Sequence, residues 1–166
     1  MGILKKTCLF VLLVVCSGLC FAKQISFQVV QHDESLKTVG EQSLIIEDEI
    51  LTGLFNCGYI VTNSVAAVSS SDGNDEKLWK LGLDEAVDGY SDYFVQINLF
   101  FTSPKEGSKG AAKLEKVYWS ISNAKTGSIL AEKKVSASNA VNADDLRAIS
   151  AVLVTDINKI VKENKA

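Results

Sequence analysis

Histidine, cysteine and proline are scarce in this chain, and their scarcity excludes several kinds of site. The 166 residues include one proline, one histidine and four cysteines. A Ser-His-Asp or Cys-His catalytic set would have to use His32, and a zinc site usually draws on several His or Cys ligands. The motifs G-x-S-x-G, G-x-x-x-x-G-K-S/T and G-x-G-x-x-G are absent. We therefore expect no enzyme activity, no metal site and no cofactor.

The chain also has no excess of positive charge. The 17 Lys and Arg are outnumbered by 20 Asp and Glu, which gives a formal charge of −3, whereas proteins that bind nucleic acid usually carry a basic face. Hydrophobic residues make up 47% of the chain, which is enough for a packed core. These properties predict a single globular domain and exclude nucleic acid as the main partner.

The first 22 residues have the three-part pattern of a secretory signal peptide. A lysine pair forms the positive region, residues 8–16 form an apolar run, and smaller residues lead to Ala22. The run is too short to span a bilayer, and Cys20 and Ala22 satisfy the small-residue preference of signal peptidase. We expect cleavage after Ala22, export to the periplasm or to an envelope-associated location, and one domain over residues 23–166.

An acylated cysteine in the leader is the alternative. A lipoprotein needs a small residue just before the modified cysteine, whereas Leu19 precedes Cys20 and Val15 precedes Cys16. Membrane attachment is expected only if one of these cysteines carries a lipid. Cleavage would leave Cys57 as the single thiol, which cannot form an internal disulfide. Its apolar neighbours favour a small buried residue over a reactive thiol.

Alternating and helical patterns order the rest of the chain. We expect strands at 24–31, 59–62 (extending as far as 68), 93–101 and around 117–121 and 129–135, and helices at 39–56, 75–88 and from 142 onward. The order β-α-β-α-β-β-β-α predicts a mixed α/β fold with one sheet of about five strands and three helices. The strand–helix–strand units imply parallel neighbours, and the last strands form an antiparallel meander.

The same patterns assign side chains to the core or to solvent. The strand at 24–31 is predicted to be half-buried, and His32 after it is predicted to be exposed. Trp119 is expected inside and Tyr118 outside, because neighbouring strand residues point to opposite faces. The buried stripes of the first and last helices are expected to include Val39, Ile46, Ile50, Leu51, Leu54, Phe55, Leu146, Ile149, Leu153, Ile157 and Ile160, and the last strand to turn Ile129, Ala131 and Val135 inward. The weaker helix at 75–88 carries the apolar residues Leu78, Trp79, Leu81, Ala86 and Val87.

Three acidic groupings are interpreted as structural. Residues 72–76 contain oxygen ligands that would suit calcium but lack the spacing of an EF-hand, and we read them as a turn that leads into a helix cap. The consecutive acids at 47–49 spread around a helix, and those at 84–88 lie on one exposed helix side. None of the groupings predicts the paired carboxylates of an acid–base catalyst.

Three segments, taken together, resemble a known family. Residues 51–61 read as an amphipathic helix, a glycine and a strand; residues 86–95 as small residues, Asp-Tyr and a core strand; and residues 119–130 as a hairpin with a Thr-Gly turn. This series resembles the α/β domain shared by the penicillin-binding-protein activator LpoB, the curli secretion protein CsgG and the N-terminal domain of TolB. The resemblance implies an envelope module that organises or activates cell-wall or outer-membrane machinery by docking a protein partner.

The expected function is therefore a secreted, non-enzymatic envelope protein that binds another protein. The polar segment 103–113, read as a long hairpin loop, is the candidate docking site. Lys105, Lys109 and Lys113 would meet an acidic partner surface, and Tyr118 would anchor nearby. The alternative is a flexible loop that its charges keep in solution. The sequence leaves the identity of the partner and the oligomeric state open.

A small periplasmic carrier of a ligand or lipid is the second class of function. It would use an apolar pocket between the sheet and Phe94 or Phe100. A fold without a cavity of ligand size would remove this class.

Overall fold

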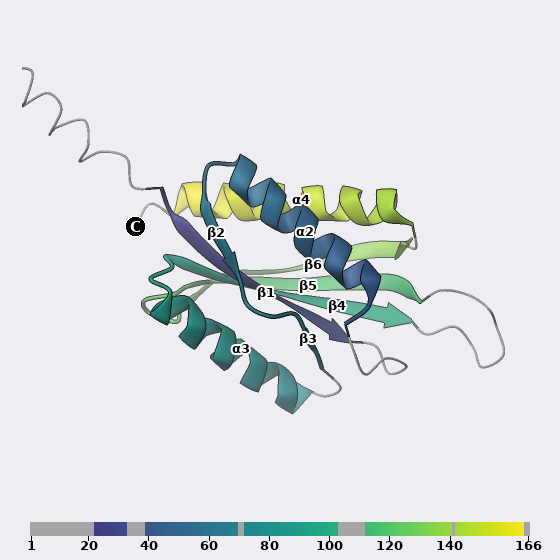
Figure 1. Ribbon diagram of the computed structural model, residues 1–166, viewed down its shortest axis with the longest axis horizontal. Helices are drawn as coiled ribbons and strands as arrows, with labels where there is room; N and C mark the ends of the chain where they lie inside the picture. Colours follow the sequence, from purple (N-terminus) through teal and green to yellow (C-terminus); the bar gives the residue numbers. More distant parts are fainter. Residues whose placement is uncertain (1–21, 33–38, 70–71, 103–111, 141, 165–166) are drawn as a thin grey trace, which may run out of the picture.

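A computed structural model describes residues 22–32, 39–69, 72–102, 112–140 and 142–164. Within these ranges it contains one mixed sheet and three helices, as the sequence predicts, with six strands in place of about five and helices on both faces of the sheet (Figure 1). The elements are β1 (Gln24–His32), α2 (Glu41–Asn56), β2 (Ile60–Asn63), β3 (Ala67–Val68), α3 (Asp72–Asp88), β4 (Tyr93–Thr102), β5 (Lys113–Asn123), β6 (Ile129–Ala140) and α4 (Ala143–Glu163). The predicted signal peptide falls almost wholly outside the described residues.

The sheet has the strand order β2-β1-β4-β5-β6, and β3 pairs with β1 beyond β2. β1 is parallel to β2, β3 and β4, and β4, β5 and β6 form the expected antiparallel meander. The prediction that β1 is half-buried is wrong, because β1 lies inside the sheet with helices over both faces, and its residues 25–31 are buried (Figure 1). Polar side chains such as Gln28 on this strand therefore face protein instead of water.

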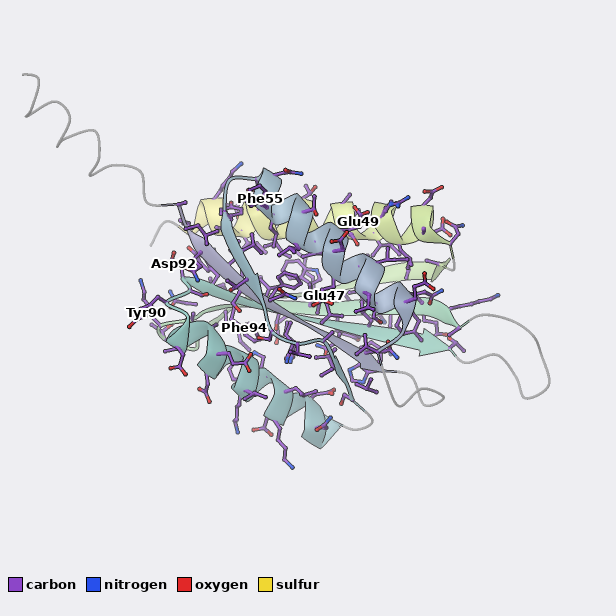
Figure 2. All side chains as sticks on the ribbon, viewed as in Figure 1. Glu47, Glu49, Phe55, Tyr90, Asp92 and Phe94 are labelled. Atoms are coloured by element: carbon purple, nitrogen blue, oxygen red, sulfur yellow. The ribbon has the colours of Figure 1, made fainter. Side chains whose placement is uncertain are left out.

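The larger core lies between the sheet and helices α2 and α4. Phe27 and Trp119 from the sheet meet Ile50 of α2 and Leu153 of α4 there, and all four side chains are buried. The prediction for Phe55 is wrong: its side chain is 68% exposed at the outer end of α2 (Figure 2). It follows the buried Leu54 directly, and neighbouring helical residues point about 100° apart.

Both ends of α4 are held by polar groups. Asn142, the predicted cap, accepts a 2.9 Å hydrogen bond from the backbone N–H of Asp145. At the other end, the Lys23 ammonium donates to the carbonyls of Val161 and Asn164 at 2.8 and 2.9 Å. The amine thus binds unsatisfied carbonyls at the negative end of the helix dipole, and it connects the start of β1 to the end of α4.

Helix α2 is anchored at its first turn by a buried glutamine of β1. Gln31 Oε1 accepts hydrogen bonds from the backbone N–H of Gly40 and from the Ser43 hydroxyl, both at 2.7 Å. The Gln31 amide takes the place of an N-cap side chain, because the N-cap residue Gly40 has none. The helix begins at Glu41, two residues later than predicted, and ends before Gly58, whose φ of +90° confirms the left-handed conformation.

A smaller core lies on the opposite face of the sheet, under α3. Phe94 is buried there against Ala86 and Ala124 (Figure 2). Helix α3 begins at Asp72, three residues before the predicted start. Leu81 and Val87 are exposed. The face of α3 that packs against β1 and β4 is narrow, so these apolar side chains lie outside it.

Three local predictions at the strands need correction. The segment after Gly58 divides into β2 and β3, because its register against β1 changes by one residue: Asn63 pairs with Phe27, whereas Ala67 pairs with Val30. Lys113 belongs to strand β5 and not to a loop. Ile129 faces out, because a register shift in the β5–β6 ladder pairs it with Ser122. The turn before it has the predicted form, with Gly127 at φ +67°.

Candidate functional site

A groove of about 590 Å³ lies on the side of the sheet that carries α3. Helices α2 and α4 cover the opposite face, whereas α3 packs over β1 and β4 (Figure 1). The outer surface of β5 and β6 therefore forms an uncovered floor beside α3. The lining includes Asp75 and Trp79 of α3, Gln96, Asn98 and Phe100 of β4, Tyr118 and Ser120 of β5, and Ile129, Glu132 and Lys134 of β6.

Strand register determines which side chains share this floor. Asn98 of β4 pairs with Tyr118 of β5, and Tyr118 pairs with Lys134 of β6, so these three form one row across the sheet. The next row consists of Gln96, Ser120 and Glu132. Residues two apart on a strand point to the same face. The floor is thus a regular grid of aromatic, amide and charged groups.

Two lysines and two aromatic rings form one cluster on this floor, which we call the Lys–Tyr cluster: Phe100, Lys116, Tyr118 and Lys134. The rings of Phe100 and Tyr118 meet edge to face with centroids 5.7 Å apart. The Lys116 ammonium lies 4.5 Å from the Phe100 centroid and 5.7 Å from the Tyr118 centroid. The Lys134 ammonium lies 5.6 Å from the Tyr118 centroid. Both positive charges thus flank one ring, which is 42% exposed.

His32 of β1 lies next to Phe100 at the edge of the same floor. It is not exposed, contrary to the prediction from the sequence. Its side chain is 14% exposed and stacks on Phe100 with centroids 4.2 Å apart and planes 10° apart. Nε2 is 3.6 Å from Asp75 Oδ1 and 3.4 Å from Asn98 Oδ1. Asp75 also accepts a hydrogen bond from the Ser69 hydroxyl. The histidine extends β1 by one residue and links the first turns of α3 to β4.

The predicted site residues are only partly brought together. Lys105 and Lys109 lie outside the described residues. Lys113 is exposed at the start of β5 and is not among the groove residues. Tyr118 points outward as predicted and lines the groove. The structure therefore places Tyr118, but not the three lysines, in the groove lining.

Sequence reasoning missed Lys134 and Trp79 as groove residues, and it missed Lys116 as a neighbour of the Tyr118 ring. The sequence holds a weak signal for the positions of the two lysines. Lys116 is two residues from Tyr118 and Lys134 is two residues from Glu132, so each pair lies on one face of its strand. Of the two phenylalanines predicted beside a pocket, Phe100 lines the groove and Phe94 is buried under α3. The cavity of ligand size that a carrier requires is therefore present.

Cys57 and His32, the two residues considered for a Cys-His pair, lie near opposite ends of β1. Cys57 is half-buried at the end of α2, near the start of β1, whereas His32 is at the far end of that strand. No group of three or more His, Cys, Asp or Glu that could hold a metal ion occurs among the described residues. Within those residues, too, no helix is long and apolar enough to cross a membrane.

The acidic groupings make local contacts. Glu47 accepts a 2.6 Å hydrogen bond from the Asn63 amide. Glu49 accepts one from Arg147 at 3.0 Å, and the carboxylates of Glu49 and Asp144 raise the pKa of that guanidinium. Figure 2 shows Glu47 and Glu49 at opposite edges of α2, Glu47 toward β2 and Glu49 toward α4. These contacts join α2 to β2 and α4, so two of the three acids at 47–49 have structural partners.

Comparison with known proteins shows a family and a shared fold. A family model described as "Uncharacterised protein" matches residues 24–161. No curated protein matches the sequence. The hypothetical protein CT253 from Chlamydia trachomatis superposes with a TM-score of 0.55 at 9% identity, over 87% of this chain and all of that chain. Its likeness shows that a bacterial protein shares the fold.

Two further solved structures are similar over most of this chain. TolB from Acinetobacter baumannii gives a TM-score of 0.48 at 12% identity, over 86% of this chain and 29% of that chain. PelC from Paraburkholderia phytofirmans, solved as a dodecamer, gives 0.47 at 10% identity, over 82% of this chain and 89% of that chain. By the match over residues 24–161, the chain belongs to the family that this model describes.

Proposed function

We propose that this protein is an exported, non-enzymatic binding module of the bacterial envelope that docks a partner protein in the groove beside α3. The observation that carries the proposal is the uncovered floor of β5 and β6, where the half-exposed Tyr118 and Ile129 lie in a concave surface. Exposed aromatic side chains in a concave surface are typical anchors of protein interfaces. The leader pattern and the resemblance to the LpoB, CsgG and TolB domain support the envelope as the setting.

The groove suits the docking of a chain segment. Its volume lies within the range of about 300–1,000 Å³ that binding sites usually have. Trp79 forms one wall and Tyr118 the floor, so an apolar side chain can insert between two aromatic surfaces. Gln96, Asn98 and Ser120 supply donors and acceptors between them. This combination of apolar anchors with a few placed polar groups gives orientation as well as affinity.

A small-ligand carrier is the second candidate function, and the cavity itself favours it. A compound that filled the groove would contact Phe100 and Trp79 on its apolar sides and the amides of Gln96 and Asn98. The two functions differ in what copurifies with the protein. A carrier retains a small molecule, and a docking module retains a protein.

The test compares two variants with matched exposure. Tyr118 is 42% exposed in the groove, and Val152 is 50% exposed on the outer side of α4. Full-length protein with a C-terminal tag, purified from the cells that make it, is used to identify copurifying proteins. The best-enriched partner is then purified and titrated with wild type, Tyr118→Ala and Val152→Ala. A buried aromatic anchor predicts a Kd at least about 30-fold weaker for Tyr118→Ala.

An unchanged Kd for Val152→Ala together with the loss for Tyr118→Ala supports the proposal. Equal losses for both variants, or no protein whose binding depends on Tyr118, would overturn it. Recovery of a small molecule that is displaced by no protein and lost in Tyr118→Ala would overturn it in favour of the carrier.

A further inference from the structure

We infer that the groove binds an extended, acidic segment of the partner protein, with a carboxylate held between Lys116 and Lys134. This inference rests on the proposed function and names the chemistry of the partner. It follows from three features of the floor: the position of the two ammonium groups, the aromatic ring between them, and the two-residue spacing of the polar side chains.

The two ammonium groups have no carboxylate partner within the described residues at the 4.0 Å limit for a salt bridge. Lys133, next to Lys134 on the same strand, points to the other face and pairs with Asp156 of α4 at 2.9 Å. The contrast separates the two faces of β6. On the α4 side Lys133 is paired within the fold. On the groove side Lys134 shares the lining with Asp75 and Glu132, but among the described residues it forms no salt bridge with either, so its ammonium can bind a carboxylate of a ligand.

Tyr118 concentrates these charges at one place. Both ammonium groups lie within 6 Å of its ring centroid. A cation above an aromatic ring keeps N–H donors for another acceptor, because the ring faces only part of the ammonium. A carboxylate that enters here gains two positive neighbours in a chain whose formal charge is −3. An aromatic or aliphatic side chain beside that carboxylate would pack on Tyr118 and Trp79.

The spacing of the amides favours an extended peptide. Gln96, Asn98 and Phe100 alternate along β4, so they repeat about every 6.6 Å, the distance at which an extended chain repeats its own backbone groups. The amide of Asn98 donates to Gln96 at 3.5 Å, and that of Gln96 donates to Gln28 at 3.4 Å. Contacts of this length are weak. Gln96 is buried and Asn98 is half-buried, so the amide of Asn98 can exchange its weak contact for a shorter bond to an N–H or C=O group of a bound peptide.

The experiment uses defined probes in place of the natural partner. Full-length, isotope-labelled protein is titrated with three blocked pentapeptides, Glu-Glu-Phe-Glu-Glu, Gln-Gln-Phe-Gln-Gln and Lys-Lys-Phe-Lys-Lys, and backbone amide shifts are followed by NMR. A fourth probe, tetragalacturonic acid, supplies carboxylates on a glycan. We expect the acidic peptide to bind most tightly, with shifts confined to β4, β5, β6 and the start of α3.

A charge-matched pair of variants locates the effect. Lys116→Gln/Lys134→Gln removes two charges from the Lys–Tyr cluster, and Lys159→Gln/Lys162→Gln removes two exposed charges from α4. Two exposed ion pairs predict that the first variant binds the acidic peptide about threefold to tenfold more weakly. The second variant should bind it like the wild type. Raising the salt from about 50 to about 500 mM should remove the difference between wild type and the first variant.

The outcomes separate this inference from the proposed function. Equal binding of the acidic and glutamine peptides in the groove would overturn the charge preference and leave the groove as a peptide-docking site. Tightest binding of the lysine peptide would likewise overturn it. Tighter binding of tetragalacturonic acid than of any peptide would overturn both this inference and the docking of a protein. Equal weakening by the two double variants would assign the effect to net charge and overturn the inference.

Discussion

The position of α3, which forms one wall of the groove, depends on a glycine where the helix crosses Phe94. A Cβ at Gly82 would lie 2.4 Å from Phe94 Cζ and 2.8 Å from Cε2. Phe94 is fully buried, so its ring has no open space into which it can move. Gly82→Ala therefore forces the helix or the ring to shift, although alanine is the better helix former. The prediction is a loss of stability where helix propensity alone predicts a gain.

The size of the effect follows from two opposing contributions. Overpacking a buried site costs about 1–3 kcal/mol, and contacts as short as these place Gly82→Ala near the upper end of that range. Replacing glycine by alanine inside a helix contributes about 1 kcal/mol in the other direction. We expect a net loss of about 2 kcal/mol in the free energy of unfolding. For a domain of this size that corresponds to a Tm lower by roughly 6 °C.

Urea denaturation followed by far-ultraviolet circular dichroism measures this loss, and a double-mutant cycle tests its cause. Phe94→Leu removes the ring atoms nearest to Gly82. In that background Gly82→Ala should be neutral or stabilising by up to about 1 kcal/mol, which gives a coupling energy of about 2–3 kcal/mol. Stabilisation by Gly82→Ala in the wild type, or an equal loss in both backgrounds, would refute the close packing of α3 on Phe94.

Three further predictions concern single positions. Tyr90 has φ +59°, occupies the left-handed C-cap position of α3 and is 88% exposed (Figure 2). Because glycine adopts this backbone conformation without strain, Tyr90→Gly should raise the free energy of unfolding by about 1 kcal/mol. A lower midpoint in urea would contradict backbone strain at Tyr90. Asn142→Ala should cost about 1 kcal/mol through the lost cap of α4, and Asn142→Ser should restore most of it in the same assay. Burial is the main cause that raises the pKa of Tyr59 above 10.0, and the nearby Cys57 and Tyr93 raise it further. The folded state therefore holds the phenolic proton more tightly than the unfolded state, and the free energy of unfolding should fall as the pH rises above about 10. Tyr59→Phe should reduce this alkaline loss in thermal melts, while removing the 2.7 Å hydrogen bond to Asn158 at neutral pH.

The sequence predicts the elements that carry a strong local signal. The spacing of Ile46, Ile50 and Leu54 forms the buried stripe of α2, and Asn142 caps α4 as expected. The prediction that β1 is half-buried failed. Its alternation of polar and apolar residues is typical of a strand with one wet face, but the amide of Gln28 receives a bond from Gln96 beneath α3.

The groove could be predicted only in part, because it depends on register between strands. Tyr118 was expected outside, since it alternates with the apolar Val117 and Trp119. Lys134 joins it only because the β5–β6 ladder pairs the two, and Ile129 turns outward only because that ladder shifts near the hairpin. The contact of His32 with Asp75 likewise spans 43 positions of sequence. No local pattern encodes such distances.

Photo-crosslinking at single positions tests the central claim most directly. p-Benzoylphenylalanine replaces Tyr118 in one strain and Val152 in another, and the crosslinked peptide is identified by mass spectrometry. The groove account predicts that only the probe at position 118 captures one defined protein, at a segment dominated by Asp and Glu, and that Lys116→Gln/Lys134→Gln reduces this product. Capture of the same protein at the same segment from position 152, without a product from position 118, would contradict it.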